Sequence, residues 1–492
     1  MSRDGSLHEP ERPGLPPRKM LGRTRHVHFV GIGGIGMSGI AELLVNMGYE
    51  VSGSDAKRSD VTARLEELGA RVYSGHDPRH LGAADVVVMS SAVRLDNVEI
   101  VEAHRRRVPV IPRAEMLAEL MRLQYGIAVA GSHGKTTTTS MVALVLERAG
   151  LDPTAVIGGR LSAFGSNARL GRGESMVVEA DESDRTFLKL SPTVALVTNI
   201  DREHMDAYGS WEALQLAFVE FVNKVPFYGA AVLCTDDAPV RDLLPHVMRR
   251  VISYGLDARA GGTPDVAGHG VQLEPFGSRC IVSGLVDEAR RELGALRLSV
   301  PGRHNLLNAL GAVAVGLELQ VPYGIIAAAL EEFTGAERRF QRRGERRGVM
   351  LVDDYGHHPT ELAAVIAAAR PSGRRIVIAF QPHRYSRTRD LMEEFGAALG
   401  AADEVILTDI YPAGEAPIEG VTVDALASAI RRAAACPLHV VRNLGDVPRA
   451  VAQVARAGDL VITLGAGTIG TIGEAVLAAL AEPAFERREG EA

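Results

Sequence analysis

Short apolar runs alternate along the chain with segments of helical pattern. The runs at 26–30, 49–52 and 85–89 predict buried strands, and residues 36–47 predict a helix that ends at Gly48. Strands that alternate with helices are typical of a parallel sheet. The first part of the chain, to about residue 123, is therefore predicted to be an α/β unit.

The same alternation occurs twice more. A second unit has predicted strands at 125–130, 176–179 and 194–198, helices at 304–319 and 325–333, and a surface loop at the Gly- and Ala-rich segment 258–270. A third unit has predicted strands at 350–352, 376–379, 405–407 and 460–463, with helices between them. We predict a disordered tail at 1–22 and three domains at 23–124, 125–335 and 336–492.

Composition narrows the class of protein. The 492 residues are enough for about three domains. Acidic residues number 61 and basic residues 54, so the net charge of −7 gives no general attraction to nucleic acid or an anionic membrane.

No segment approaches the roughly 18 apolar residues of a membrane span, and residues 1–22 lack the apolar core of a secretion signal. Three scattered cysteines fit a reducing, cytoplasmic compartment.

The segment Gly131-Ser-His-Gly-Lys-Thr-Thr137 directly follows a predicted strand and opens a helix. It is a shortened form of the phosphate-binding loop. Its glycines allow backbone N–H groups to point at phosphate oxygens, and the helix N-terminus adds a partial positive charge. Lys135 would reach the β- and γ-phosphates, and the Thr136 hydroxyl would ligate Mg²⁺.

A second glycine-rich loop, Gly31-Ile-Gly-Gly-Ile-Gly36, also joins a predicted strand to a helix. It matches the GxGxxG pattern of dinucleotide sites, and Asp55 follows about 20 residues later. The geometry holds any diphosphate at a helix N-terminus. The motif therefore predicts a diphosphate site without identifying the nucleotide.

Acidic and histidine side chains follow two strands of the second unit. Glu179 ends an apolar strand beside the phosphate loop, where a magnesium ligand is expected. His204 follows the next strand and would emerge at the same edge of a parallel sheet, as a metal or phosphate ligand.

Two further polar clusters, 353–361 and 381–388, follow strands of the third unit. Open α/β sheets bind ligands at this edge. His383, Arg384 and Arg387 would hold carboxylates or phosphates. The local spacing contains no HExxH motif and no neighbouring cysteine, so magnesium rather than zinc is expected.

Together these motifs resemble the Mur ligase family of ATP-dependent amide ligases in peptidoglycan precursor synthesis. The resemblance extends from about residue 25 to 480. Within the family, the sequence is most similar to the branch that adds L-alanine. It is carried by residues 28–38, 131–137, 181–184, 198–199, 204–206, 303–308 and 354–361. It implies an α/β fold with an N-terminal Rossmann-like parallel sheet, a central P-loop ATPase-type domain and a C-terminal Rossmann-like domain. Ser132 replaces a common threonine and keeps its hydroxyl.

The resemblance also implies roles for individual residues. The UDP-sugar would be bound by Gly31, Gly33, Gly34, Gly36 and Asp55. ATP would be bound by Gly131, Ser132, His133, Gly134, Lys135, Thr136, Thr137, Asn305, Asn308, Arg339 and Asp354. Thr136, Glu179 and His204 would hold Mg²⁺. The catalytic set would be Lys135, Glu179, His204, Arg339 and His357, with His383, Arg384 and Arg387 around the amino acid and acyl group.

In the reaction that the resemblance implies, ATP phosphorylates the lactyl carboxylate of UDP-N-acetylmuramate, and the amine of L-alanine then attacks the acyl phosphate. The site would be completed by domain closure about hinges near 123–125 and 335–338. Phe218 stands where several relatives carry a carbamylated lysine, so no carbamate is expected. The expected partners are these small molecules, with no nucleic acid or membrane, and the chain would be a monomer or homodimer.

Three alternatives remain open. A sibling ligase that attaches a preformed peptide to the same UDP-sugar shares the phosphate loop, although its branch departs from the first glycine-rich loop. A dinucleotide-dependent oxidoreductase would bind NAD at 31–36. A non-catalytic nucleotide sensor would be expected to lose Lys135 or the magnesium ligands, which are present here.

Overall fold

The computed structural model describes residues 21–90, 92–157, 168–256, 262–286 and 289–482. Apart from residues 21 and 22, the predicted tail lies outside these ranges. The chain divides into two compact units between Gln124 and Tyr125. None of the helices in the described ranges is both long and apolar enough to cross a lipid bilayer.

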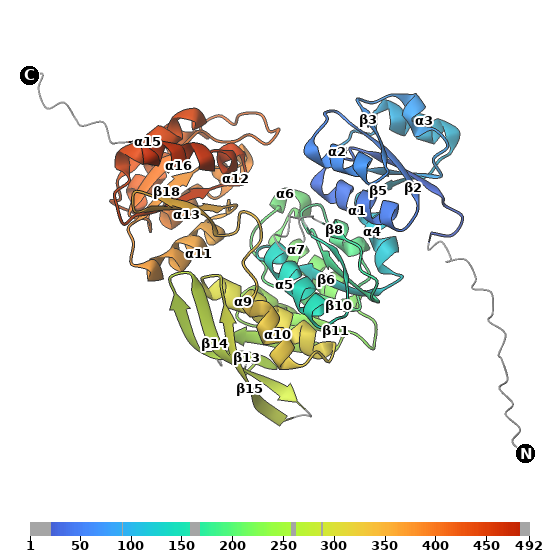
Figure 1. Ribbon diagram of the computed structural model, residues 1–492, viewed down its shortest axis with the longest axis horizontal. Coiled ribbons are helices and arrows are strands. Elements are labelled where there is room, and N and C mark those ends of the chain that lie inside the picture. Colours follow the sequence, from blue (N-terminus) through green and yellow to red (C-terminus); the bar gives the residue numbers. More distant parts are fainter. Residues whose placement is uncertain (1–20, 91, 158–167, 257–261, 287–288, 483–492) are drawn as a thin grey trace, which may run out of the picture. The chain divides into compact units, whose positions relative to one another are not determined.

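The first unit is a parallel sheet of five strands in the order β3-β2-β1-β4-β5 (Figure 1). The buried apolar strand β1 lies at its centre, and the chain turns to opposite sides of β1 to form β2 and β4. Ligands of open α/β sheets bind at such a switch point, and the loop after β1 is the first glycine-rich loop. The elements are β1 (His26–Val30), α1 (Ile35–Asn46), β2 (Glu50–Asp55), α2 (Asp60–Glu67), β3 (Arg71–Ser74), the 3₁₀ turn η1 (Pro78–Leu81), β4 (Val86–Met89), α3 (Val98–Arg106), β5 (Val110–Pro112) and α4 (Arg113–Met121).

The second unit begins with a ten-stranded sheet in the order β15-β14-β13-β12-β11-β10-β6-β9-β7-β8. The seven neighbouring strands β13, β12, β11, β10, β6, β9 and β7 are parallel to one another. Strand β8 is antiparallel to β7, β14 is antiparallel to β13, and β15 is antiparallel to β14. The strands are β6 (Tyr125–Ala130), β7 (Thr154–Val156), β8 (Ala168–Arg169), β9 (Ser175–Glu179), β10 (Val194–Val197), β11 (Ala230–Cys234), β12 (Val251–Leu256), β13 (Val266–Glu274), β14 (Gly277–Val286) and β15 (Ala289–Leu298). The phosphate loop follows β6, between β10 and β9.

Helices α5, α9 and α10 pack together in one buried apolar cluster with the central strands (Figure 1). The helices of this part are α5 (Lys135–Arg148), α6 (Met205–Tyr208), α7 (Trp211–Asn223), α8 (Ala238–Leu243), α9 (Arg303–Glu318) and α10 (Tyr323–Glu331), with the 3₁₀ turns η2 (Thr186–Lys189) and η3 (Leu244–His246). Because α5 and α9 are packed against each other, the start of α9 lies near the phosphate loop: a Cβ on Gly134 would lie 2.5 Å from Asn308 Oδ1.

The predicted surface loop at 258–270 is wrong in its second half. Residues 257–261 lie outside the described ranges, but Val266 and Ala267 are buried in β13. They pair with Gly284 and Ser283 of β14, and Val266 also pairs with Tyr254 of β12. These partners are distant in sequence, so the Gly-rich composition concealed a strand that is stabilised by non-local pairing.

The second unit also contains a six-stranded sheet in the order β16-β17-β21-β18-β19-β20, parallel except at β16. Apolar clusters pack on both of its faces. Its strands are β16 (Gln341–Arg346), β17 (Val349–Asp354), β18 (Ile376–Phe380), β19 (Glu404–Leu407), β20 (Leu438–Val440) and β21 (Leu460–Leu464). Its helices are α11 (Pro359–Ala369), α12 (Tyr385–Asp390), α13 (Met392–Leu399), α14 (Val423–Ala433), α15 (Val447–Val454) and α16 (Gly473–Ala481), with 3₁₀ turns η4 (Arg370–Ser372), η5 (Leu444–Asp446) and η6 (Thr468–Thr471).

Phe218 packs α7 against the 3₁₀ turn η2. Its side chain is fully buried, and its ring lies edge-on to Phe187 at 5.3 Å between centroids. We expect Phe218→Ala to lower the free energy of unfolding of the second unit by about 3–5 kcal/mol, because it leaves a cavity. Urea denaturation measures this loss. Phe227→Ala, at a side chain that is 92% exposed, is the control and should change stability by less than about 0.5 kcal/mol. Equal effects would contradict the packing.

Candidate functional site

The phosphate loop leaves β6 and enters α5 through two glycines that no other residue could replace without movement. Gly131 has φ +132°, and a Cβ there would lie 2.1 Å from Thr198 Oγ1. Gly134 has φ +81° and occupies the position before the first turn of α5. Positive φ is readily adopted only by glycine. The glycine pattern of the sequence thus reflects a tight turn packed against the loop after β10.

Side chains after β10 hold this turn in shape. The His133 N–H donates to Asn199 Oδ1 at 2.8 Å. The His133 carbonyl accepts from Thr198 Oγ1 at 2.7 Å and from Asn199 Nδ2 at 3.0 Å. Because α5 follows the turn directly, these bonds fix the start of a helix whose free N–H groups attract anions.

Lys135 lies folded back over the loop. Its Nζ donates to the carbonyl oxygens of Gly131 and Ser132 at 2.6 and 3.0 Å and to Glu182 Oε1 at 2.9 Å. Burial lowers the pKa of Lys135, but the attraction of Glu182 outweighs it and the pKa is raised overall. Burial also raises the pKa of the Glu182 carboxyl, against the opposing effect of Lys135. The lysine therefore keeps its charge in the buried site.

Two of the predicted magnesium ligands meet. Thr136 Oγ1 donates to Glu179 Oε1 at 3.0 Å, so two hard oxygen atoms lie side by side at the end of β9 and the start of α5. Such oxygen donors suit Mg²⁺. The Nε2 atom of His204 lies 3.9 Å from Glu182 Oε1, and burial lowers the pKa of His204. Glu182, Glu203 and His204 bring potential ligand atoms within 4.8 Å of one another.

Residues of β17 and the segment before β16 form the opposite wall. Asp354 accepts the N–H groups of Phe340 and Gly356, each at 2.7 Å, and burial raises its pKa to about 6 despite the nearby Arg339. Arg339 Nη1 donates to Glu361 Oε1 at 3.2 Å. Glu361 itself closes the first turn of α11, since its other oxygen accepts the N–H of His357 at 2.9 Å.

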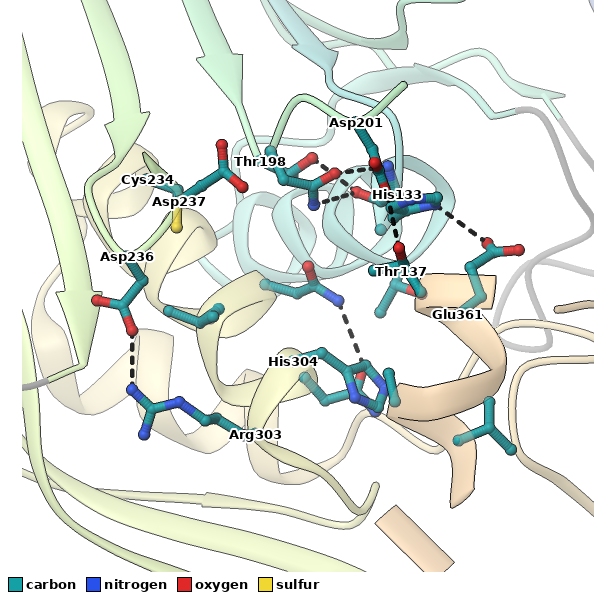
Figure 2. A pocket seen from close by; sticks show the side chains of 18 of the residues that line it. His133, Thr137, Thr198, Asp201, Cys234, Asp236, Asp237, Arg303, His304 and Glu361 are labelled. Atoms are coloured by element: carbon teal, nitrogen blue, oxygen red, sulfur yellow. Dashed lines mark hydrogen bonds and ion pairs between the residues drawn. The ribbon is translucent and has the colours of Figure 1, made fainter. Parts of the chain in front are cut away.

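Between these walls is a cavity of about 520 Å³, a size that suits a nucleotide-sized ligand. Figure 2 shows His133, Thr137 and Glu361 together on one side of it and Asp236 and Arg303 on another. The predicted residues that line it are His133, Gly134, Thr137, Asn305, Asn308, Arg339 and Asp354. Lys135 and Thr136 are not part of this lining and lie beside it on α5.

Several lining residues were not predicted as site residues: Tyr254, Cys234, Asp236, Asp237, Arg303 and His304. Arg303 donates to Asp236 Oδ2 at 2.9 Å across the cavity (Figure 2). Strands β11 and β12 carry no recognisable motif. For the residues in or after these strands, the sequence signal was their position in the same parallel sheet, at the edge where β6 ends. Arg303 and His304 lie at the start of α9, within the signature segment 303–308.

Asp201 is a further residue that the sequence did not single out. Its Oδ2 accepts from His133 Nε2 at 2.9 Å and from Thr360 Oγ1 at 2.6 Å, so it joins the phosphate loop to α11. Burial lowers the pKa of His133, but the hydrogen bond with Asp201 and the nearby carboxylate of Glu361 raise it to about 10. The imidazole is therefore charged at neutral pH.

His357 lies close to His383 and Arg387 of the predicted amino-acid region. The rings of His357 and His383 lie 5.7 Å apart, and burial lowers the pKa of each to about 4. Arg387 Nη1 lies 3.5 Å from His383 Nδ1, and its Nη2 lies 3.7 Å from Glu203 Oε1. Arg384 has φ +73°, and its backbone N–H donates to the Tyr411 carbonyl.

The first unit holds the other predicted loop. The Gly33 N–H donates to Asp55 Oδ2 at 2.9 Å, and Gly31 has φ +84°. A Cβ on Gly36 would lie 2.5 Å from Arg113 Nη1. The aspartate at the end of β2 is thus bonded to the glycine turn, and the backbone approaches a cationic side chain.

Family models match three consecutive parts of the chain. They are the Mur ligase family catalytic domain at 26–125, the Mur ligase middle domain at 129–316 and the Mur ligase glutamate ligase domain at 338–467. The chain belongs to the Mur ligase family. The resemblance in the sequence motifs and the three-part α/β fold are thereby confirmed.

Within the Mur ligases, similar relatives include the UDP-N-acetylmuramate–L-alanine ligases of Geobacter sp. (strain M21) and Myxococcus xanthus (strain DK1622). Each is 54% identical to this chain, and each alignment covers 93% of this chain. The alignments cover 98% of the Geobacter protein and 96% of the Myxococcus protein. A solved UDP-N-acetylmuramate-alanine ligase from Thermotoga maritima has a TM-score of 0.77 at 28% identity and covers 92% of this chain and 99% of its own. A murein peptide ligase from Psychrobacter arcticus shares the fold, with a TM-score of 0.67 at 24% identity. The match covers 94% of this chain and 100% of the Psychrobacter protein.

The ion pair of His133 and Asp201 predicts a pH dependence. A raised histidine pKa contributes stability that is complete below the unfolded value near 6.5 and is lost as pH rises through about 10. We expect Asp201→Asn to destabilise the protein at pH 6 and the difference from wild type to shrink by at least about 1 kcal/mol at pH 10. Urea denaturation with a chelator present measures both. A difference that is constant with pH would contradict the charged pair.

Proposed function

We propose that this chain joins L-alanine to the lactyl carboxylate of UDP-N-acetylmuramate, with ATP as co-substrate, in the cytoplasmic synthesis of peptidoglycan precursors. The observation that carries the proposal is the 54% identity, over 93% of the chain, to relatives named for this reaction. The geometry of the second unit supplies groups suited to each step.

The first step brings a carboxylate oxygen to the γ-phosphorus of ATP and expels ADP, which leaves an acyl phosphate. Both reactants are anions, so the protein must neutralise charge and align them. Lys135 keeps its proton beside the loop carbonyls and would contact the β- and γ-phosphates. We assign Arg339 to the phosphates and Asp354 to the ribose, with Asn305 and Asn308 at the adenine.

Mg²⁺ would be held by Thr136 and Glu179, whose oxygens lie 3.0 Å apart, with His204 assigned to a second ion. When bound, it would offset phosphate charge.

The second step needs a neutral amine on L-alanine and a binding site for its carboxylate. Arg384 and Arg387 are suited to the carboxylate because guanidinium groups bind it through two hydrogen bonds. Burial keeps the imidazoles of His357 and His383 neutral at pH 7, so each offers an acceptor nitrogen to the amine. Attack gives a tetrahedral intermediate, whose collapse forms the amide and releases phosphate.

We assign the UDP-sugar diphosphate to Gly31, Gly33, Gly34 and Gly36, with Asp55 toward the uridine. The first unit would deliver this substrate and the second would hold ATP. The domain limits 23–124, 125–335 and 336–492, closure about 123–125 and 335–338, and an assembly no larger than a homodimer are part of the same proposal.

Substrate dependence tests the proposal directly. We expect phosphate release from Mg-ATP with UDP-N-acetylmuramate to require L-alanine and to yield the UDP-sugar amide. Release only with an L-alanine-containing tripeptide would favour the peptide-adding sibling. No release with either, together with tight NAD binding, would favour the oxidoreductase alternative.

Removing the lysine charge tests the phosphate site. We expect Lys135→Met to lower kcat by about 10²–10³-fold, because a preorganised cation is lost where charge develops. Steady-state phosphate release measures it. Lys189→Met removes an exposed lysine of the same unit and is the matched control. A loss below about tenfold would mean that Lys135 does not contact the phosphates.

A substitution in the first loop should act on one substrate alone. A Cβ on Gly33 would lie 2.9 Å from Asp55 Oδ2 and 3.1 Å from Thr62 Cγ2. We expect Gly33→Val to raise KM for UDP-N-acetylmuramate by about tenfold or more, since about 1.4 kcal/mol of binding suffices for that, and to leave KM for ATP unchanged. Gly324→Ala is the control, because a Cβ added there would meet no atom within 4 Å. A parallel rise for ATP would contradict the assignment.

A further inference from the structure

Three side chains that are far apart in the sequence converge beside the phosphate loop. His133, Glu203 and His358 bring potential ligand atoms within 4.8 Å of one another. They come from the phosphate loop, from the segment between β10 and α6, and from the residue that precedes α11. No local spacing in the sequence indicates this cluster.

Each of the three has a buried polar atom without a hydrogen-bond partner: His133 Nδ1, Glu203 Oε1 and His358 Nε2. Glu203 and His358 are 8% and 3% exposed. The nearest charged groups, Glu361 at His133 Nδ1 and Arg387 at Glu203 Oε1, are each 3.7 Å away, beyond hydrogen-bond distance. Buried polar atoms nearly always have a partner, so three together point to a ligand.

Asp201 orients the His133 imidazole through its other nitrogen and lies close to the corresponding nitrogen of His358. Its Oδ2 lies 2.9 Å from His133 Nε2 and 3.4 Å from His358 Nδ1. Histidines that bind metals usually contact a carboxylate or carbonyl through the second ring nitrogen, which fixes the ring and leaves the first nitrogen for the metal. Asp201 is in this supporting position for His133. His358 Nδ1 accepts the Thr360 N–H at 3.4 Å, and metal binding at Nε2 would place the ring proton on Nδ1, where it would face Asp201 Oδ2.

We propose that His133, Glu203 and His358 form a binding site for a transition-metal dication of the zinc class, separate from the Mg²⁺ ligands Thr136 and Glu179. Two imidazoles and one carboxylate are a ligand set that zinc accepts in four-coordinate sites with one open position. Imidazole favours Zn²⁺, Co²⁺ and Ni²⁺ over Mg²⁺. The cation would replace a proton on His133, so its binding would release a proton.

The site would join the start of α11 to the phosphate loop, since His358 and His133 lie on the two sides. Metal binding to the folded chain adds stability by mass action. Glu203 also belongs to the cluster with Glu182 and His204, so an experiment must distinguish the two sets.

The test uses the full-length chain, stripped of metal and without nucleotide, so it does not depend on the proposed ligase reaction. Co²⁺ is titrated and followed by the visible absorption of its low-symmetry complexes, and Zn²⁺ is added in competition. We expect one equivalent of Co²⁺ to bind and Zn²⁺ to displace it, with Mg²⁺ unable to do so. His133→Gln and His358→Gln should each weaken binding by at least about tenfold.

His357→Gln is the matched control, because it removes the neighbouring imidazole outside the set and should leave Co²⁺ affinity unchanged. His358 accepts the Thr360 N–H at the start of α11, so unfolding by urea checks that its variant folds; His133→Gln is independent of that cap. Absence of a Co²⁺ complex would overturn the proposal. So would binding that survives both His133→Gln and His358→Gln, or binding that is lost only in His204→Gln.

Discussion

The site depends on the close contact between the turn after β6 and the loop after β10. Gly131 has no room for a side chain against Thr198, and Thr198 and Asn199 bond both backbone polar groups of His133. This contact determines where α5 starts and therefore where Lys135 and Thr136 point. It exists because β6 and β10 are neighbouring parallel strands whose carboxyl ends coincide.

A second set of polar contacts connects this turn to the C-terminal sheet. Asp201 accepts from both His133 and Thr360, and Glu361 lies between His133 and Arg339. These contacts bring α11 to the edge of the central sheet where the phosphate loop lies. A cavity lined from both sheets follows from them, and Asp354 and Arg339 can then face the same space as Asn305 and Asn308.

The sequence predicted the parts of the site that local chemistry determines. Gly131, Gly134 and Lys135 form a spaced motif, and the Thr136–Glu179 pair follows from two parallel strands ending together. The strand at Val266 and the cavity residues Tyr254 and Asp236 were not predicted, because only distant pairing brings them into place. Asp201 and Glu203 lie just before the predicted ligand His204, but their roles depend on α11, which sequence spacing does not position.

The folded-back Lys135 has a consequence for how the loop selects its ligand. The ammonium group of Lys135 already donates a hydrogen bond to the carboxyl group of Glu182. An incoming anion must exchange with this carboxylate before it gains the lysine, so a singly bound ion such as sulfate gains little from entering. A nucleotide bound as proposed would offset this exchange with its base and ribose contacts. The loop would then favour ligands that make several contacts at once, and Glu182 would disfavour the binding of simple anions.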